Sequence, residues 1–350
     1  MLFAIGGESG AHPFATRYGR AMKSILVAGG AGYIGSHVVL SFLRAGHRVT
    51  VLDNLSTGRQ ANLLEGASFV HGDVQDRTLL RDVLAQNYDA AIHLTALKAA
   101  GESMEFPERY ARQNISGTLN LLEAVSNSAT RCFIFSSSAA VYGAPEFLPI
   151  SEEHPLRPAN FYGFTKLEIE RLLAWYDRLK GIRFACLRYF NAAGYDANGE
   201  ICGLESNPAN LLPVVMETVC GKRDRLQVFG NDFPTKDGTG VRDYIHATDL
   251  ADAHLKAFET VSADRRSLTV NLGTGRGHSV MEVVRMTERV TGREVPFEMV
   301  ARRKGDPPEL FADSRLANRL LHWTPQFSDL KTVVDSTWQA YRRQTVLRPR

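Results

Sequence analysis

Tyr162 and Lys166 stand four residues apart in a segment with helical periodicity, so both side chains project from one face of the predicted helix. A phenol is a weak base near neutral pH. A nearby ammonium, together with a nicotinamide cation, stabilises the phenolate and lowers the pKa of the phenol. Such a pair can take a proton from a substrate hydroxyl while a cofactor accepts a hydride. The same spacing is common in ordinary helices, so context must decide its meaning.

Three serines, Ser136 to Ser138, follow an apolar run that begins at Phe133. If that run is a parallel strand, the serines lie at its carboxyl end, where open α/β sheets bind ligands. Ser138 can then donate a hydrogen bond to the substrate oxygen that Tyr162 deprotonates. For Ser136 and Ser137 the alternative is a solvated, serine-rich end of a strand.

A glycine-rich turn separates a predicted strand from a predicted helix. In the pattern Gly30-x-Gly32-x-x-Gly35, one glycine permits the tight turn, the next lets a pyrophosphate approach the backbone, and the last lets helix and strand pack closely. Amides at the helix start receive the phosphates. The turn indicates a bound dinucleotide; its alternatives are a flavin, another nucleotide or a tight turn without a ligand. The cofactor residues expected here are Gly29, Gly32, Tyr33, Ile34 and Gly35.

Acidic residues follow the next two predicted strands. Asp53 ends the second strand, roughly 20 residues after the turn, where a carboxylate accepts hydrogen bonds from a ribose diol. Because this carboxylate would repel a 2′-phosphate, the position favours NAD over NADP. Asp73 and Val74 follow the third strand, and the Asp73 carboxylate can meet the amino group of adenine.

These residues need a scaffold that brings the ends of several strands together. From Ser24 to about Asn191, short apolar strands alternate with helical segments, and this pattern is typical of a parallel sheet covered on both faces. We therefore expect an α/β fold, a Rossmann-like doubly wound parallel sheet. Its strands are expected at 25–27, 49–52, 68–71, 90–94, 132–135 and 184–187.

The chain beyond Asn191 is richer in Gly, Asn, Asp and Pro, which predicts a smaller C-terminal α/β substrate lobe. We assign residues 24–190, with 238–275 returning to them, to an NAD-binding domain, and 191–237 with 276–345 to a substrate-binding lobe. Expected elements are a helix at 211–219, a strand at 226–229, a helix at 250–258 and a strand at 268–272. Ser279 and Glu282 have the spacing of a capping box, and helical patterns follow near Ala317 and Val333.

Composition excludes several classes of function. The 350 residues carry a formal net charge of +3 and 44% hydrophobic residues, and acids and bases are mixed along the chain, which argues against nucleic acid and membrane partners. The longest apolar run is shorter than the roughly 20 residues that a membrane-spanning helix needs. Residues 1–23 form an irregular extension without the pattern of a secretory signal, and Met22 is a candidate start. Neither disulfide nor metal-ligand spacing relates Cys132, Cys186, Cys202 and Cys220, so we expect a cytoplasmic protein without a metal.

With these motifs in this order, the chain resembles the extended short-chain dehydrogenase/reductases. A narrower resemblance, to the UDP-glucose 4-epimerase family, rests on the strings HLTALKAAGES at 93–103, FGND at 229–232 and DGTGVRDYIH at 237–246. The resemblance extends from Ser24 to about Tyr341. It implies an NAD-dependent isomerase that interconverts UDP-glucose and UDP-galactose by oxidation at carbon 4, rotation of the 4-keto sugar and re-reduction.

The resemblance also implies roles for residues. Tyr162 is the acid/base, Lys166 lowers its pKa and binds the nicotinamide ribose, and Ser138 donates a hydrogen bond to the sugar. The cofactor site is completed by Asn54, Leu94, Lys98, Asn114 and Phe190. The nucleotide-sugar site is formed by Asn191, Asn210, Leu211, Phe229, Arg242, Arg303 and Asp306. Two arginines suit a pyrophosphate, because each guanidinium offers a fork of donors; the alternative for each is an ordinary surface position.

Two residues depart from the family pattern. Phe164 stands where the family usually carries a polar or basic residue, and we expect it to point away from Tyr162 and Lys166 and to leave the chemistry intact. Leu310 stands where enzymes restricted to UDP-glucose and UDP-galactose tend to have a tyrosine next to the sugar. Because a leucine leaves more room, we expect some turnover of N-acetylated UDP-sugars.

Three other functions compete with this one. A UDP-pentose or UDP-uronic acid 4-epimerase would use the same chemistry. A nucleotide-sugar 4,6-dehydratase carries an Asp-Glu pair after the serine, where this chain has Ala139 and Ala140. A non-enzymatic NAD-binding regulator typically lacks the Tyr-Lys pair.

The resemblance suggests a homodimer formed through residues 114–125 and 166–179, although apolar periodicity there equally fits burial against the sheet. Because the cofactor is reduced and reoxidised in one turnover, it has no need to leave. We therefore expect NAD to copurify at about one molecule per chain.

Overall fold

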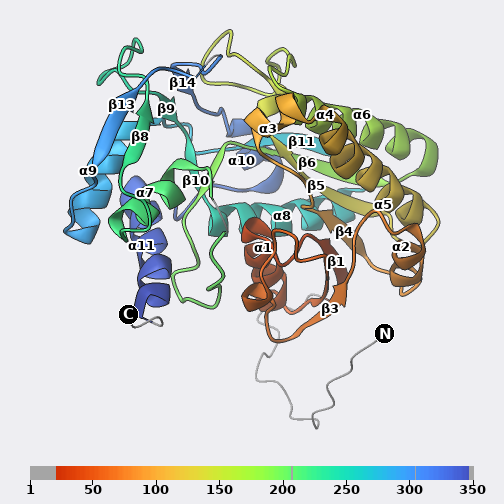
Figure 1. Cartoon of the computed structure of the whole chain (residues 1–350). Helices are drawn as coiled ribbons and strands as arrows, with labels where there is room; N and C mark the ends of the chain where they lie inside the picture. Colours follow the sequence, from red (N-terminus) through yellow and green to blue (C-terminus); the bar gives the residue numbers. More distant parts are fainter. Residues whose placement is uncertain (1–20, 206–207, 304, 347–350) are drawn as a thin grey trace.

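A computed structural model of the chain describes residues 21–205, 208–303 and 305–346. Its centre is a parallel sheet of seven strands in the order β11-β6-β5-β4-β1-β2-β3 (Figure 1). The strands are β1 (Ser24–Ala28), β2 (Arg48–Asp53), β3 (Ala67–His71), β4 (Ala90–His93), β5 (Cys132–Ser138), β6 (Arg183–Tyr189) and β11 (Leu268–Leu272). Residues 1–20 of the predicted irregular N-terminal extension lie outside the residues that the structure describes.

Helices cover both faces of the sheet, because the apolar side chains of its central strands point to both (Figure 1). On one face, α1 (Tyr33–Arg44), α8 (Ala247–Asp264) and α10 (Arg315–Leu321) share a core that includes Phe42, Phe258 and Trp323. On the other, α2 (Arg77–Leu84), α5 (Gly117–Ser126) and α6 (Phe161–Lys180) contribute Leu80, Leu121 and Leu173 to a second core. The predicted Rossmann-like doubly wound sheet is confirmed.

A third core lies apart from this sheet, at the left of Figure 1. Its helices are α7 (Leu211–Val219), α9 (Val280–Thr291) and α11 (Leu330–Val346). Small sheets join strands that are distant in sequence: β8 (Leu226–Phe229) with β13 (Phe297–Val300), β7 (Asn191–Ala193) with β10 (Tyr244–His246), and β9 (Val241–Arg242) with β12 (His278–Ser279) and β14 (Glu309–Leu310). The division into two domains stays a prediction.

Local signals explain where several elements begin. Ser279 caps α9 in the predicted capping box with Glu282, and the Asn160 side chain accepts from the Gly163 amide at the start of α6. Helix α7 and strand β8 have the bounds that their apolar patterns predict. Sequence reasoning did not find α3 (Ala100–Glu105), α4 (Pro107–Tyr110) or the π-helical segment Ala111–Ser116. In the part of the chain that the structure describes, no helix is long and apolar enough to cross a bilayer.

Candidate active site

The glycine turn packs too closely for side chains. A Cβ atom on Gly35 would lie 2.0 Å from the Gly29 carbonyl oxygen, and one on Gly30 would lie 2.9 Å from the Val51 methyls. Gly29 has a φ of +87°, which favours glycine. Gly32 caps α1 without a side-chain hydrogen bond, so the first amides of α1, at Tyr33 to Gly35, face a position suited to phosphate. This cradle fits the pyrophosphate of a dinucleotide.

The turn is fastened by its own side chains and by a neighbouring loop. The Tyr33 hydroxyl donates to the Gly194 carbonyl at 2.5 Å, while Ile34 packs against the core under α1. The buried Asn62 amide donates to the carbonyls of Ala31, at 3.3 Å, and Gly203, at 3.2 Å, and accepts from the Gly203 amide at 2.8 Å. Asn62 therefore ties the loop at 201–205 to the glycine turn.

Carboxylates line the carboxyl ends of β2 and β3. Asp53 is buried and accepts hydrogen bonds from the Ala31 amide at 3.0 Å and the Leu55 amide at 2.8 Å, one on each oxygen. Each oxygen keeps a further lone pair for a ribose hydroxyl. Asn54 donates to Asp73 at 2.6 Å. The two predicted acidic positions thus lie at the same edge of the sheet as the turn, and Val74 is buried beneath them.

Tyr162 and Lys166 lie in the first turns of α6, as predicted, beside the end of β5. The buried Lys166 Nζ donates to the Ser136 carbonyl at 2.7 Å and lies 4.7 Å from the Phe135 ring centroid. Its distance to the Tyr162 ring centroid is 5.9 Å. The Tyr162 backbone amide is held by the Ser103 hydroxyl at 3.0 Å. Phe164 is exposed and packs on Phe161, so its predicted orientation away from the pair is confirmed.

Burial dominates the electrostatics of Tyr162 and Lys166. Burial raises the pKa of Tyr162, with the hydrogen bond from Ser138 opposing the rise, and burial lowers the pKa of Lys166 to about 7. The lowering of the Tyr162 pKa by the Lys166 ammonium together with a nicotinamide cation stays a prediction. The Lys166 charge acts on the phenol only where something else keeps that lysine protonated.

The serine run is not a solvated strand end. Strand β5 continues through Ser138, and Ser136 and Ser137 are buried. The Ser136 hydroxyl contacts Nε2 of His254 at 3.0 Å, and the Ser137 hydroxyl donates to Glu170 at 2.5 Å. The alternative considered for these two serines is thus wrong. Ser138 accepts from the Ala140 amide at 3.2 Å and is the serine on the side of Tyr162.

The other predicted cofactor residues surround the loop after β4. Leu94 follows β4 and packs against the sheet core. Asn114 is buried, accepts from the Leu97 amide at 2.9 Å and donates to Thr165 at 3.0 Å, so it joins this loop to α6. The exposed Lys98 pairs with Glu205 from the loop that Asn62 holds. Phe190 lies at the end of β6 in an apolar cluster with Leu310.

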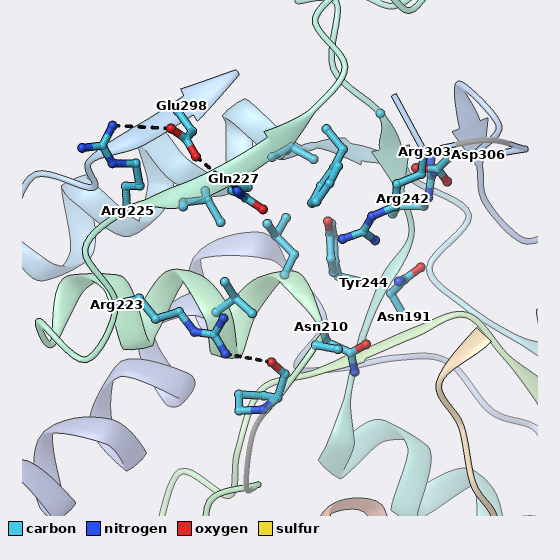
Figure 2. A pocket seen from close by; sticks show the side chains of 18 of the residues that line it. Asn191, Asn210, Arg223, Arg225, Gln227, Arg242, Tyr244, Glu298, Arg303 and Asp306 are labelled. Carbon is cyan, nitrogen blue, oxygen red and sulfur yellow. Dashed lines mark hydrogen bonds and ion pairs between the residues drawn. The ribbon is translucent and has the colours of Figure 1, made fainter. Parts of the chain in front are cut away.

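A cavity of about 950 Å³ opens beside this centre. Seven of the predicted substrate residues line it together: Asn191, Asn210, Leu211, Phe229, Arg242, Arg303 and Asp306. Figure 2 shows Arg242, Arg303 and Asp306 gathered at one end and Arg223, Arg225 and Glu298 toward the other. Ser138, Tyr162 and Leu310 do not line it. The register nevertheless links the two places, because Ser138 pairs with Tyr189, two residues before Asn191.

The two predicted arginines have different surroundings. The Arg242 side chain is only 14% exposed, donates to the Val241 carbonyl at 2.7 Å and pairs with Asp306. Arg303 is exposed, and its guanidinium lies over the Phe229 ring. Leu310 pairs with Arg242 in the β9–β14 ladder. An ordinary surface position, the alternative weighed for both arginines, does not describe Arg242.

Sequence reasoning missed several lining residues. Tyr244, Arg223 and Gln227 face the cavity, and Tyr244 belongs to the string DGTGVRDYIH, which could have identified it. Asp243, in the same string, is buried and accepts from Thr274, Gly275 and Ala312, so it fixes the segment that carries Arg242. Within residues 21–205, 208–303 and 305–346, no group of three His, Cys, Asp or Glu side chains could hold a metal ion.

Comparisons with known proteins agree with this geometry. Residues 25–273 match the NAD dependent epimerase/dehydratase family. The chain is 43% identical to a UDP-glucose 4-epimerase of Halalkalibacterium halodurans over 91% of this chain and 96% of that protein. A solved UDP-glucose 4-epimerase from Brucella ovis in complex with NAD is 44% identical, with a TM-score of 0.89 over 91% of this chain and 98% of that one.

A second solved structure holds both kinds of ligand. It is the UDP-glucose-4-epimerase from Stenotrophomonas maltophila with bound NAD and formylated UDP-arabinopyranose, 40% identical, with a TM-score of 0.89 over 93% of this chain and all of that one. The family match at residues 25–273 includes the glycine turn and the strands of the central sheet. The chain therefore belongs to the NAD dependent epimerase/dehydratase family, among its UDP-glucose 4-epimerases.

Proposed function

We propose that the cavity and the Tyr162 centre act in one reaction, the NAD-dependent interconversion of UDP-glucose and UDP-galactose. The chain is an isomerase of the UDP-glucose 4-epimerase type. The observation that carries the proposal is the β5–β6 register, which sets Ser138 opposite Tyr189, two residues before the cavity residue Asn191. A hexose joined to a nucleotide in the cavity can therefore reach the Tyr162 hydroxyl.

Bound NAD supplies the acceptor and donor of the hydride. Tyr162 takes the proton from the 4-hydroxyl of the sugar and returns it after rotation of the 4-keto form, and Ser138 donates a hydrogen bond to the same oxygen. Lys166 holds the charge beside Tyr162 and orients the nicotinamide ribose. Asp53 accepts from the adenosine ribose, and the first amides of α1 receive the pyrophosphate.

For the 4-keto sugar to rotate within the site, the protein must hold the diphosphate firmly and contact the hexose only loosely. Arg242 and Arg303 provide guanidinium donors at one end of the cavity, with Phe229 and Leu211 as apolar walls. On the sugar side, Phe190 and Leu310 offer apolar surface without fixed hydrogen-bond geometry. The anchors are therefore charged and the hexose surroundings are not.

The decisive experiment incubates the purified protein with a panel of UDP-sugars, without added NAD, and separates the products. We expect UDP-glucose and UDP-galactose to interconvert, and Tyr162→Phe to abolish turnover while NAD content and folding persist. Tyr176→Phe, on the same helix, is the matched control and should keep full activity. Biological activity unchanged in Tyr162→Phe would favour a regulator instead, and turnover of UDP-pentoses or UDP-uronic acids alone would assign the chain to those substrates.

Leu310 carries the proposal that N-acetylated sugars are accepted as well. Its side chain packs in the apolar cluster with Phe190, Ala139 and Tyr142. Ala139 is the residue that directly follows Ser138. A leucine there leaves space that a tyrosine would fill. Absence of product from UDP-GlcNAc, where UDP-galactose turns over readily, would refute this part alone.

A homodimer through α5 and α6 is a further proposal. Helix α6 exposes Trp175 and Leu179, four residues apart on one face, at 55% and 68%. Exposed apolar side chains of this size mark interaction surfaces when they cluster. A sizing column separates dimer from monomer. The cytoplasmic location also stays a proposal, supported by the buried thiols of Cys132 and Cys186, which form no disulfide.

A further inference from the structure

We infer that the buried ion pair of Glu170 and Arg188, fixed by Ser137, is a positioning unit that holds Lys166 in its working place and charge state. The inference rests on the role of Lys166 in the proposed function. None of these three residues touches substrate or cofactor in the arrangement proposed above, so they act through Lys166.

The geometry of the pair is specific. Arg188 Nε lies 2.9 Å from Glu170 Oε1, and Arg188 Nη2 lies 2.5 Å from Glu170 Oε2, so the guanidinium holds both carboxylate oxygens. Ser137 donates to Oε1 at 2.5 Å. Both side chains are buried, with exposures of 8% and 6%. A bidentate pair of this kind fixes orientation as well as charge.

The pair continues into a polar chain beneath the site. Arg188 Nη1 donates to the Tyr142 hydroxyl at 2.9 Å, and Tyr142 donates to Asn271 at 2.6 Å. Asn271 in turn donates to the Ile150 carbonyl at 2.9 Å. Hydrogen bonds therefore satisfy the buried charges, and this series of hydrogen bonds connects β5, β6, α6 and β11. Such a satisfied network favours one arrangement of these elements.

Three consecutive residues of β5 thereby serve three different contacts. The Ser136 carbonyl accepts from Lys166, the Ser137 hydroxyl donates to Glu170, and the Ser138 hydroxyl faces Tyr162. Lys166, Glu170 and Tyr162 all belong to α6, at spacings of four residues. The ion pair joins α6 to β6, and the Ser137–Glu170 hydrogen bond fixes the register between α6 and β5, on which the distance from Lys166 to Ser136 depends.

Glu170 also supplies the negative charge next to Lys166. Burial lowers the pKa of Lys166 to about 7, and the carboxylate of Glu170, together with Cys186 on β6, opposes this effect. The other groups that face Lys166 are the Ser136 carbonyl and Phe135 ring of β5, Tyr162 on its own helix and His93 of β4. Burial holds His93 neutral by lowering its pKa to about 3. Glu170 is therefore the anion on which the charge of Lys166 depends.

The test compares Glu170→Gln and the double variant Glu170→Gln with Arg188→Met against the wild-type holoenzyme. The double variant leaves no unpaired buried charge and so keeps the test valid if the single variant does not fold. Glu168→Gln removes a partly exposed carboxylate of α6 that pairs with Arg171 and is the matched control. Two readouts are measured against pH: kcat, and the ultraviolet absorption of the Tyr162 phenolate, obtained by subtracting the Tyr162→Phe spectrum in each background.

Loss of the carboxylate should move the alkaline limb of kcat down by about one pH unit or more, because an opposite charge nearby shifts a pKa by roughly that amount. Tyr162 should ionise at higher pH in the same variants, while Glu168→Gln matches the wild type. A uniform fall of kcat without either shift would overturn the inference and leave a structural role. Lys166→Met separates the two proposals. Wild-type turnover in this variant overturns both. If Lys166→Met is inactive but the Glu170 variants show neither the shift in kcat nor the shift in Tyr162 ionisation, only the positioning unit is overturned.

Discussion

The guanidinium of Arg303 lies 3.9 Å from the centroid of the Phe229 ring, and both residues line the cavity. This stacking holds a flexible cation at one end of the cavity. We expect Arg303→Ala to raise KM for the UDP-sugar about tenfold or more, since a hydrogen bond to a charged group contributes roughly 1.5–3 kcal/mol. The value of kcat should change little. Initial rates over a range of UDP-galactose concentrations check this, with the exposed Arg289→Ala as control.

Asp53 offers a test of cofactor choice. In Asp53→Asn the side chain keeps one acceptor oxygen, so one of the Ala31 and Leu55 amides loses its partner, at a cost of about 1–3 kcal/mol. We expect less bound NAD and weaker discrimination against NADP, because no charge then repels a 2′-phosphate. The measurements are the amount of NAD released from the purified variant and its affinities for NAD and NADP. Asp82→Asn, an exposed change on α2, should leave both unchanged.

Asn62 should govern how long the cofactor stays. Its amide holds the loop at 201–205 against the glycine turn, and Asn62→Ala removes all three hydrogen bonds. We expect about one NAD per chain on denaturing the wild type and a faster exchange of NAD in the variant. Exchange against labelled NAD is the measurement, and Gln60→Ala, in the same short turn but exposed, is the control. Equal exchange rates would show that this loop does not retain NAD.

Leu310→Tyr should narrow the range of sugars. The larger side chain must fit beside Phe190 in the same apolar cluster, so we expect turnover of UDP-GlcNAc to fall by at least tenfold relative to UDP-galactose. Product ratios from parallel incubations check this. If both substrates slow by the same factor, the variant has disturbed packing rather than selectivity.

The environment of His37 predicts that the folded protein loses stability as the pH falls. Its Nδ1 contacts the Tyr33 carbonyl at 2.8 Å and its Nε2 accepts from the Asp196 amide at 3.0 Å, and burial lowers its pKa to about 4 from 6.5. A lowered pKa means that the unfolded chain binds the proton more readily. The contribution to stability is therefore present above pH 6.5 and is lost as the pH falls toward 4, up to about 3 kcal/mol.

Urea unfolding at pH 7.5 and pH 5 measures this loss. His37→Gln carries no titrating group, so it should lose less stability on acidification than the wild type does. Burial also lowers the pKa values of His93, His246 and His254, and these act in both proteins alike. An equal loss in the two proteins would contradict the assignment to His37.

Strands of the central sheet could be predicted closely because their apolar runs end at glycine, asparagine or charged residues. Strand β5 is the instructive exception. Its apolar run ends at Phe135, yet the strand continues to Ser138, since Ser136 and Ser137 find buried partners in His254 and Glu170. Side-chain polarity predicts exposure only where no buried partner is available, and the sequence does not show the partner.

The candidate site divides in the same way. The glycine turn, Asp53 and Tyr162 could be proposed from the sequence because local spacing indicates their chemistry, within the turn, from the turn to the end of the next strand, and along one helix. Asn62 and Glu170 could not, since each looks like an ordinary polar residue until the fold brings Gly203 or Arg188 against it. The spacing of nearby residues can be recognised in a sequence, whereas contacts between residues that are distant in the chain cannot.

Strand β11 fills the edge of the sheet next to β6, although it follows β6 by roughly 80 residues in the chain. During synthesis, β6 must therefore wait with one unpaired edge until β11 leaves the ribosome, a delay on the order of ten seconds at ordinary elongation rates. An open strand edge is a template for pairing with other chains. The newborn protein is accordingly most exposed to aggregation in this interval, and slower translation of residues 190–267 lengthens it.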